Sequence, residues 1–329
     1  MKRPARPLWI LLLIYFLFSL PLLAQPETGN VSPQASADLP APSPADPARA
    51  ATPQKVYAGI YLNKVVALDL KQNTYWMDFY VWFRWKGEPD PTATYELMNT
   101  HEKWGGTTVA ESEGARKLAD GWNYQEFHIE QQFYSPFRFN AYPLDEQILR
   151  ITIEDKSHTN KVLQYLPDVS SSNYNPEIFI PGWKINKHEI QVNQHTYNTN
   201  FGQTGKAVET YSRLNFEIRM TRDPWTLHLF KLFLPIVIIL VMVFVIFFIP
   251  ISFFDSRVEI AITGLLSMIA LQMVLNDALP PVGYLTLTDR IYYFSYFVVM
   301  CALIETVWVY FSFKRDEYLA RRIDRISFR

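Results

Sequence analysis

Acidic side chains lie in and beside an apolar segment in the last third of this 329-residue chain. The stretch from Val258 to Leu275 is long enough to cross about 30 Å of hydrocarbon as a helix. At about 100° per residue, a set of side chains in and beside this stretch falls on one line along the helix. The set is Glu259, Thr263, Leu266, Ala270, Met273 and Asp277. One face therefore has a carboxylate at each end, with a hydroxyl and apolar groups between them.

This face has the chemistry of an ion pathway. A carboxylate that faces lipid costs several kcal/mol, so Glu259 should face protein or water. Several copies of the helix around an axis would give rings of carboxylates that concentrate cations, and an apolar constriction that closes by dewetting. The alternative is that Glu259 pairs with Arg257 or a neighbouring basic group inside a packed bundle.

Two more segments can span a membrane, roughly His228–Ile249 and Ile291–Phe313. We therefore expect a transmembrane domain of three helices over residues 225–313. The tail that follows, residues 314–329, is rich in Lys and Arg, and the positive-inside rule assigns such a segment to the cytoplasm. These features predict a protein of the inner or plasma membrane with a cytoplasmic C-terminus.

The N-terminal segment predicts export. Residues 1–24 combine a basic start with a short apolar run, which is typical of a secretory signal peptide, although an uncleaved anchor is the alternative. Residues 25–54 are rich in Pro, Ala and Ser and contain no aromatic residue, so we expect a disordered linker. The domain after it should be periplasmic or extracellular.

Residues 55–224 predict a β-sandwich. Alternating or β-rich runs are separated by clusters of Pro, Gly, Asn and Ser, which is the pattern of many short strands. Residues 92–121 have weak periodicity and receive no assigned structure. The predicted runs begin at Val56 and then cover Thr74–Trp85, Tyr124–Phe133, Gln147–Ile153, Trp183–Val192 and Tyr211–Met220.

The sequence contains little that could support catalysis. Cys301 is the single cysteine, and the six histidines show no paired ligand spacing. No phosphate-binding glycine loop and no local Ser, His and Asp arrangement is present. We expect no enzyme activity, no catalytic residue, no metal, no cofactor and no nucleic acid partner.

One motif makes the sequence recognisable. The segment Ser135–Gln147 reads SPFRFNAYPLDEQ and resembles the signature loop of pentameric ligand-gated ion channels, the Cys-loop receptor superfamily. Ser135 and Leu149 stand where animal members have cysteines, so the chain resembles the prokaryotic, cysteine-less branch. The resemblance continues through Arg222-Asp223-Pro224, Pro235, the acidic helix and Leu279-Pro280-Pro281, and it covers about residues 56–313.

The resemblance implies an immunoglobulin-like sandwich followed by a helical pore, assembled as a homopentamer in a lipid bilayer. It implies that an unidentified small-molecule agonist binds between neighbouring sandwiches and opens a pathway for monovalent cations. The implied agonist residues are Tyr80, Trp82 and Arg84 from one subunit and Glu154, Lys156, Tyr197 and Tyr211 from its neighbour. The implied coupling residues are Tyr142, Pro143, Leu144, Asp145, Arg222, Pro280 and Pro281, with Asp145 and Arg222 as an ion pair.

The chain departs from the family pattern in two ways. Residues 92–121 lack the Trp-x-Pro type of binding segment. The family's fourth span should begin near the point where this sequence stops, and the helical rhythm of the tail is too short to cross a bilayer, so we expect either a shortened gene product or a protein that works with three spans. The alternative function is therefore a membrane-anchored extracytoplasmic binding or sensory protein without conduction.

Overall fold

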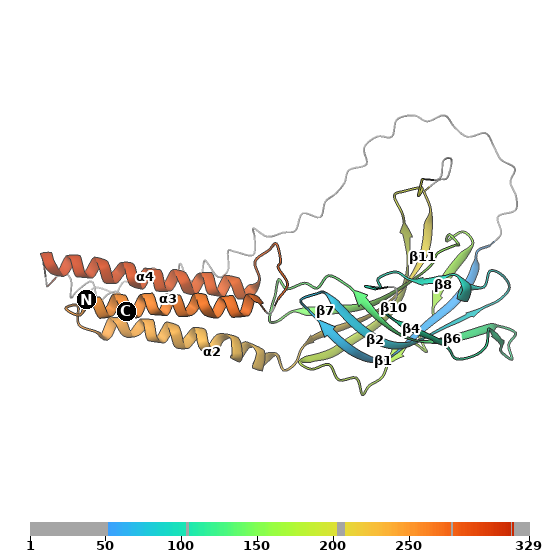
Figure 1. Ribbon diagram of the computed structural model, residues 1–329, viewed down its shortest axis with the longest axis horizontal. Coiled ribbons are helices and arrows are strands. Elements are labelled where there is room, and N and C mark those ends of the chain that lie inside the picture. The colour runs from blue at the N-terminus through green and yellow to red at the C-terminus, as the bar shows by residue number, and fades with distance from the viewer. Residues whose placement is uncertain (1–51, 103–104, 203–207, 278, 317, 319–329) are drawn as a thin grey trace, which may run out of the picture. The chain divides into compact units, whose positions relative to one another are not determined.

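The computed structural model describes residues 52–102, 105–202, 208–277, 279–316 and 318. A β-sandwich is followed in the chain by three long helices (Figure 1). The predicted signal peptide, most of the predicted linker and most of the basic tail lie outside the described residues.

Two sheets form the sandwich. The larger has the order β4-β6-β2-β1-β8, with β5 paired to β6 and β9 paired to β1, and the smaller has the order β10-β11-β7-β3. The larger sheet comprises β1 (Gln54–Asp69), β2 (Thr74–Trp85), β4 (Thr107–Ala110), β5 (Arg116–Lys117), β6 (Asn123–Tyr134), β8 (Leu163–Pro167) and β9 (Asn173–Tyr174). The smaller comprises β3 (Tyr95–Leu97), β7 (Glu146–Asp155), β10 (Trp183–Thr196) and β11 (Thr210–Arg222).

The predicted alternation of the strands is confirmed by their burial. Val56, Ala58, Ile60 and Leu62 on β1 are all fully buried, as expected for every second residue of a strand with one face on a core. The turn after β1 follows from local chemistry, because the Asp69 carboxylate accepts the backbone N–H groups of the two residues at 71 and 72. The inward faces of both sheets share one hydrophobic cluster.

Residues 92–121 contain more structure than the sequence indicates. A 3-10 turn, η2 (Pro91–Ala93), and the short strands β3, β4 and β5 lie in or at the edge of this stretch. Each of these strands has at most four residues, and β4 and β5 are exposed along their whole length. A short exposed edge strand has no buried face, so it leaves no alternation for the sequence to reveal.

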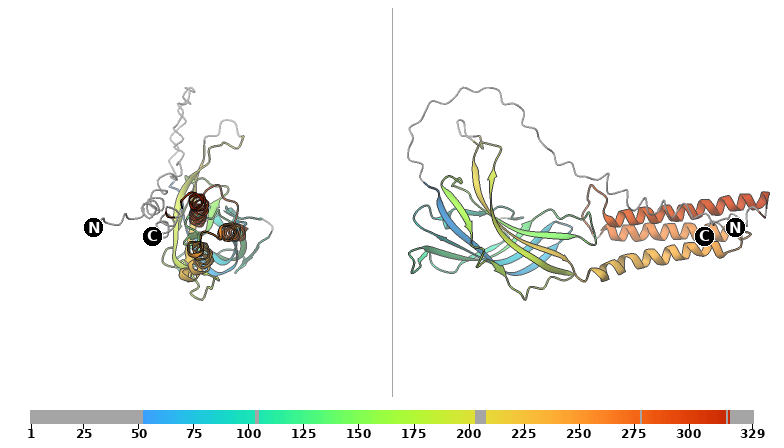
Figure 2. Two further views of the ribbon diagram at one scale, coloured as in Figure 1. Left: turned by 90° about the vertical axis from the view of Figure 1, so that its left-hand side faces the viewer. Right: turned by 180° about the vertical axis from the view of Figure 1, so that it is seen from behind.

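The three predicted spans are present as helices, and each helix begins a few residues before the predicted start. They are α2 (Trp225–Phe244), which continues as the 3-10 turn η3 (Val245–Phe248), α3 (Phe254–Asp277) and α4 (Leu287–Arg315). All are long and apolar enough to cross a membrane. Figure 2 shows α3 beside both α2 and α4, and two hydrophobic clusters contain side chains of all three helices.

Candidate functional site

The acidic face of α3 is exposed in the single chain. Every member of the predicted stripe, from Glu259 to Asp277, is classed as exposed, and Leu266 and Met273 are 61% and 68% accessible. The opposite face packs against α2 and α4 through Ala261 and Met268. The tertiary packing of one subunit therefore leaves the stripe available to something outside that subunit.

Close packing of α3 against α2 depends on a small residue. A Cβ atom added at Gly264 would lie 2.5 Å from Val243 Cγ2, so a larger residue would push the two helices apart. Small residues at such positions let membrane helices approach closely. Gly264 therefore helps to fix which face of α3 is buried.

Arg257 does not neutralise the stripe. Its side chain is only 2% exposed, and Nε donates a 2.9 Å hydrogen bond to the carbonyl of Ile249. Glu259, by contrast, is exposed and forms no ion pair within the described residues. The alternative in which Glu259 pairs with Arg257 is not the arrangement found here.

Asp277, at the other end of the stripe, contacts the sandwich. Lys71 Nζ lies 3.1 Å from Asp277 Oδ1 and 3.1 Å from the Asp277 carbonyl. Both side chains are exposed, at 56% and 85%, so solvent screens this pair and its contribution is at most about 1 kcal/mol.

Asp145 and Arg222 form a buried ion pair. Arg222 Nε donates to Asp145 Oδ1 at 2.7 Å, and Gln147 Nε2 donates to Asp145 Oδ2 at 2.6 Å. The guanidinium also lies over two aromatic rings, 4.7 Å from the centroid of Tyr142 and 4.5 Å from that of Trp183. The predicted pairing is confirmed. Both ions have further partners, so the interaction is more stable than that of an isolated buried ion pair.

The loop that contains Asp145 also contacts the connection between α3 and α4. The Phe139 N–H donates to the Tyr284 hydroxyl at 2.9 Å, and Thr288 Oγ1 donates to the Tyr142 carbonyl at 2.9 Å. A backbone bond joins the Leu287 N–H to the Asn140 carbonyl at 2.9 Å. These contacts of Tyr284 and Thr288 were not predicted from the sequence, because their partners lie almost 150 residues earlier in the chain.

The other predicted coupling residues belong to the two segments that make these contacts, the loop at the base of the sandwich and the α3–α4 connection. Pro143 is buried and Leu144 is exposed at the base of the sandwich. In the α3–α4 connection Pro280 is buried and Pro281 is exposed, while Leu279 packs against the sandwich core.

The outer face of the larger sheet presents Tyr80, Trp82 and Arg84. They alternate along β2 with fully buried residues, so their side chains share one partly exposed face. The Tyr80 ring stacks on His128 with centroids 4.4 Å apart and an interplanar angle of 10°. Trp82 Nε1 donates to Asp168 Oδ2 at 3.2 Å.

Asp78 anchors the histidine beside Tyr80. His128 Nε2 lies 2.7 Å from Asp78 Oδ1, and Lys64 Nζ lies 3.3 Å from Asp78 Oδ2. Burial opposes ionisation of Asp78, but hydrogen bonds from His128, Asn63 and Lys64 outweigh it and hold the pKa of this carboxyl below its ordinary value. An ionised carboxylate therefore contacts the histidine of the stacked pair.

A second aromatic group lies on the smaller sheet. The Tyr197 hydroxyl donates to Glu154 Oε2 at 2.8 Å, and Arg213 pairs with the other oxygen of this buried carboxylate. The Tyr197 and Tyr211 rings meet edge to face at 5.7 Å. Burial and the hydrogen bond to Glu209 raise the pKa of Tyr211 to about 12, so both phenols are neutral at physiological pH.

The predicted agonist residues thus form two sets within one chain. Tyr80, Trp82 and Arg84 lie on the larger sheet, whereas Glu154, Tyr197 and Tyr211 lie together on or beside the smaller one. Lys156 is connected through its backbone N–H, which donates to the Thr94 carbonyl at 3.0 Å.

Comparison with known proteins supports the family resemblance. No family model matches the chain. A proton-gated ion channel of Gloeobacter violaceus is 25% identical over 291 residues, which cover 84% of this chain and 78% of that protein. The beta subunit of a glutamate-gated chloride channel of Haemonchus contortus is 28% identical over 155 residues, 46% of this chain and 34% of that protein. These similarities indicate a pentameric ligand-gated ion channel.

This channel subunit has the architecture of its family, a β-sandwich followed by apolar helices. It is a membrane protein and a ligand-gated ion channel, and its relatives are not enzymes. One relative is named a chloride channel, and the name of the other states no conducted ion, so family membership alone does not assign the ion that this channel conducts.

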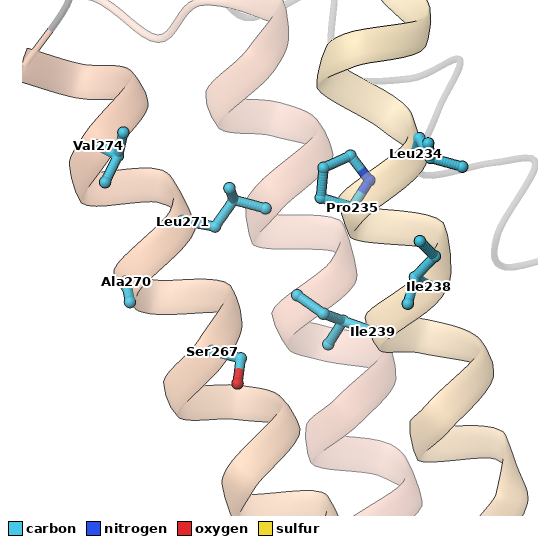
Figure 3. Close-up of a pocket in the computed structure, with 8 residues that line it drawn as sticks. All are labelled: Leu234, Pro235, Ile238, Ile239, Ser267, Ala270, Leu271 and Val274. Atoms are coloured by element: carbon cyan, nitrogen blue, oxygen red, sulfur yellow. The ribbon is translucent and has the colours of Figure 1, made fainter.

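An apolar recess of about 580 Å³ lies between α2 and α3 of the subunit (Figure 3). Leu271 from α3 and Ile239 from α2 extend into the space between the two helices. The recess adjoins the stripe, because Ala270 belongs to both. Its other lining residues are Leu234, Pro235, Ile238, Ser267 and Val274.

Sequence reasoning missed His128, Asp78 and Asp168 as neighbours of the predicted agonist residues. The β2–β6 register places Tyr80 opposite His128, and the Asp168 contact joins residues 86 positions apart. Only the pairing of the strands could have identified these contacts, because no local motif connects the residues.

Proposed function

We propose that five copies of this chain form a cation-selective channel whose pore is lined by α3. The observation that carries the proposal is the orientation of α3, with its acidic stripe exposed and the opposite face packed against α2 and α4. A carboxylate exposed at membrane depth needs water or a partner. A central pore lined by five such faces supplies the water.

In this arrangement Glu259 is the principal selectivity residue and Asp277 the outer attractor. A ring of carboxylates concentrates cations and repels anions at a narrow point. Leu266, Ala270 and Met273 form the apolar girdle between them, and Thr263 adds a hydroxyl near Glu259. The Lys71 contact weakens the negative field at Asp277, which supports giving Glu259 the larger share of selectivity.

We place the agonist between neighbouring sandwiches. Tyr80 and Trp82, with Arg84 at the margin, face across to Glu154, Tyr197 and Tyr211 of the next subunit, with Lys156 nearby. The location of the two sets on different sheets of one chain supports an interfacial site. Because Arg213 already pairs with Glu154, the charge that remains for an agonist on this side is small.

The domain order supports a matching topology. Residues 1–24 would direct export, residues 25–54 would tether the sandwich outside, and residues 314–329 would lie in the cytoplasm. In this topology the sandwich receives the agonist, and the Asp145–Arg222 junction with Pro280 and Pro281 transmits the movement to the pore.

The decisive experiment measures reversal potentials under a salt gradient in planar bilayers. Acid steps are applied first, because one relative is named a proton-gated channel, and small amines and acids follow. The wild-type reversal potential should follow the cation, and Glu259→Gln should weaken that preference while the charge-retaining control Glu259→Asp preserves it. A reversal potential that follows the anion would overturn the selectivity, and a silent, correctly assembled oligomer would overturn conduction.

A further inference from the structure

A row of alternating aromatic and cationic side chains crosses the larger sheet near the ends of its strands. The register places Tyr57 opposite Arg84, Arg84 opposite Tyr124, and Tyr124 opposite Arg116. These side chains are partly or fully exposed, so they lie on the outer face of the sheet. The row spans β1, β2, β6 and β5.

Trp122, the residue before β6, adds a third ring. Its indole meets Tyr57 edge to face at 5.5 Å. Arg84 Cζ lies 5.2 Å from the Tyr57 centroid and 5.7 Å from that of Trp122, while Lys86 Nζ lies 4.7 Å from Trp122. Two cations therefore contact one indole. We call Tyr57, Arg84, Lys86 and Trp122 the cationic aromatic cluster.

The cluster has an excess of positive charge. Over the part of the chain that the structure describes, Arg84, Lys86 and the adjacent Arg116 form no ion pair with a carboxylate. The carboxylate of Glu126 accepts a hydrogen bond from the Tyr124 hydroxyl at 3.0 Å. Cation–π contacts at exposed sites contribute only about 0.5–1 kcal/mol each, so they hold the cations in place without neutralising them.

We propose that the cationic aromatic cluster binds a small planar carboxylate at a site distinct from the agonist site. The planar fork of Arg84 matches a carboxylate in a bidentate geometry, and Lys86 supplies a second donor to the same anion. The exposed edges of Trp122 and Tyr57 offer an apolar, aromatic surface to the ligand's ring. An anion that bridges the two cations also removes their mutual repulsion.

This site does not share contacts with Tyr80 and Trp82. Tyr80 stacks on His128 and Trp82 donates to Asp168, and within the described residues neither partner contacts a side chain of the cluster. Arg84, at the margin of the agonist site in the proposed function above, would contact this second ligand instead of the agonist. A carboxylate at this site would act from outside the proposed agonist set.

Benzoate is the probe for a binding test on the full-length oligomer in detergent, by isothermal titration calorimetry. Wild type should bind benzoate, and benzyl alcohol, which has the ring without the charge, should bind at least about tenfold more weakly, the loss expected when a charge-assisted hydrogen bond is removed. Lys86→Gln and Arg84→Gln should each weaken benzoate binding about tenfold for the same reason. Lys86 is exposed, so its replacement should leave the fold intact.

Lys117→Gln is the matched control. Lys117 is an exposed cation on β5 beside Arg116, outside the cluster, and its replacement should leave benzoate affinity unchanged. The proposal is overturned if a folded oligomer does not bind benzoate, if benzyl alcohol binds equally well, or if Lys117→Gln costs as much affinity as Lys86→Gln. None of these readouts is a current, so failure here leaves the proposed conduction to its own test.

Discussion

Arg222 Nε donates a 2.7 Å hydrogen bond to Asp145 Oδ1, and these two side chains are only 9% and 1% exposed. The pair joins the last strand of the sandwich to the loop that contacts the α3–α4 connection through Tyr284 and Thr288. An ion pair in this position resists displacement, because separating its members would leave a charge buried without a partner.

Arg222→Gln should destabilise the folded protein by about 3–5 kcal/mol, because the Asp145 carboxylate remains buried without its cation. Agonist binding should persist while gating is lost. Thermal unfolding and paired binding and current measurements test both effects. The exposed pair of Lys187 and Glu189 gives the control, and Lys187→Gln should cost at most about 1 kcal/mol. A fully functional Arg222→Gln channel would remove the pair from the mechanism.

Leu266→Ala should ease channel opening. Leu266 is 61% exposed within its own subunit, so shortening it removes little packing there but widens the apolar girdle and makes dewetting less favourable. The expected result is a larger current in the absence of agonist. Met268→Ala on the buried face of the same helix is the control, and it should cost about 2–5 kcal/mol of stability instead. Equal resting currents in wild type and Leu266→Ala would contradict the girdle.

Asp78 should contribute stability that depends on pH. Its pKa in the folded protein lies below the ordinary value, so its contribution is complete above the pKa of the unfolded chain, near 3.9, and is lost as the pH falls through the lower folded value. Wild type should therefore be more stable to unfolding than Asp78→Asn near neutral pH, and this difference should shrink as the pH falls from the unfolded to the folded pKa of Asp78. Unfolding temperatures from pH 7 downward measure the difference.

Glu130→Gln is the matched control for Asp78→Asn, because Glu130 lies opposite Asp78 on β6. A difference between wild type and Asp78→Asn that stays constant with pH would show that the aspartate acts through its shape and not through its charge.

Gly59→Ala should displace the Trp82 indole. A Cβ atom at residue 59 would lie 2.2 Å from Trp82 Cζ2, a distance that no side chain can tolerate without moving. The hydrogen bond from Trp82 to Asp168 should be lost with a destabilisation of about 1–3 kcal/mol, typical of overpacking. Thermal unfolding tests this cost, and agonist potency should also fall. Gly283→Ala, where the added Cβ meets open space, is the control.

The features that sequence alone predicted depend on short-range periodicity. The stripe from Glu259 to Asp277 follows from the helical repeat, and the buried face of β1 follows from the alternation of a strand. Both patterns are properties of consecutive residues, so they can be recognised without knowledge of any tertiary contact. The same reasoning could not find β4 and β5, since short strands that are exposed along their whole length have no buried face to reveal them, and the three residues of β3 are too few to show a period.

Tertiary structure decided which distant residues meet. The Asp145–Arg222 pair joins residues 77 positions apart and was expected only from the family resemblance. The sequence did not identify the Ile249 carbonyl as the partner of Arg257, the stacking of Tyr80 on His128, or the convergence of Arg84 and Lys86 on Trp122. Helix packing and strand register determine these contacts, and both are set by the fit of whole faces across the core rather than by any local run of residues.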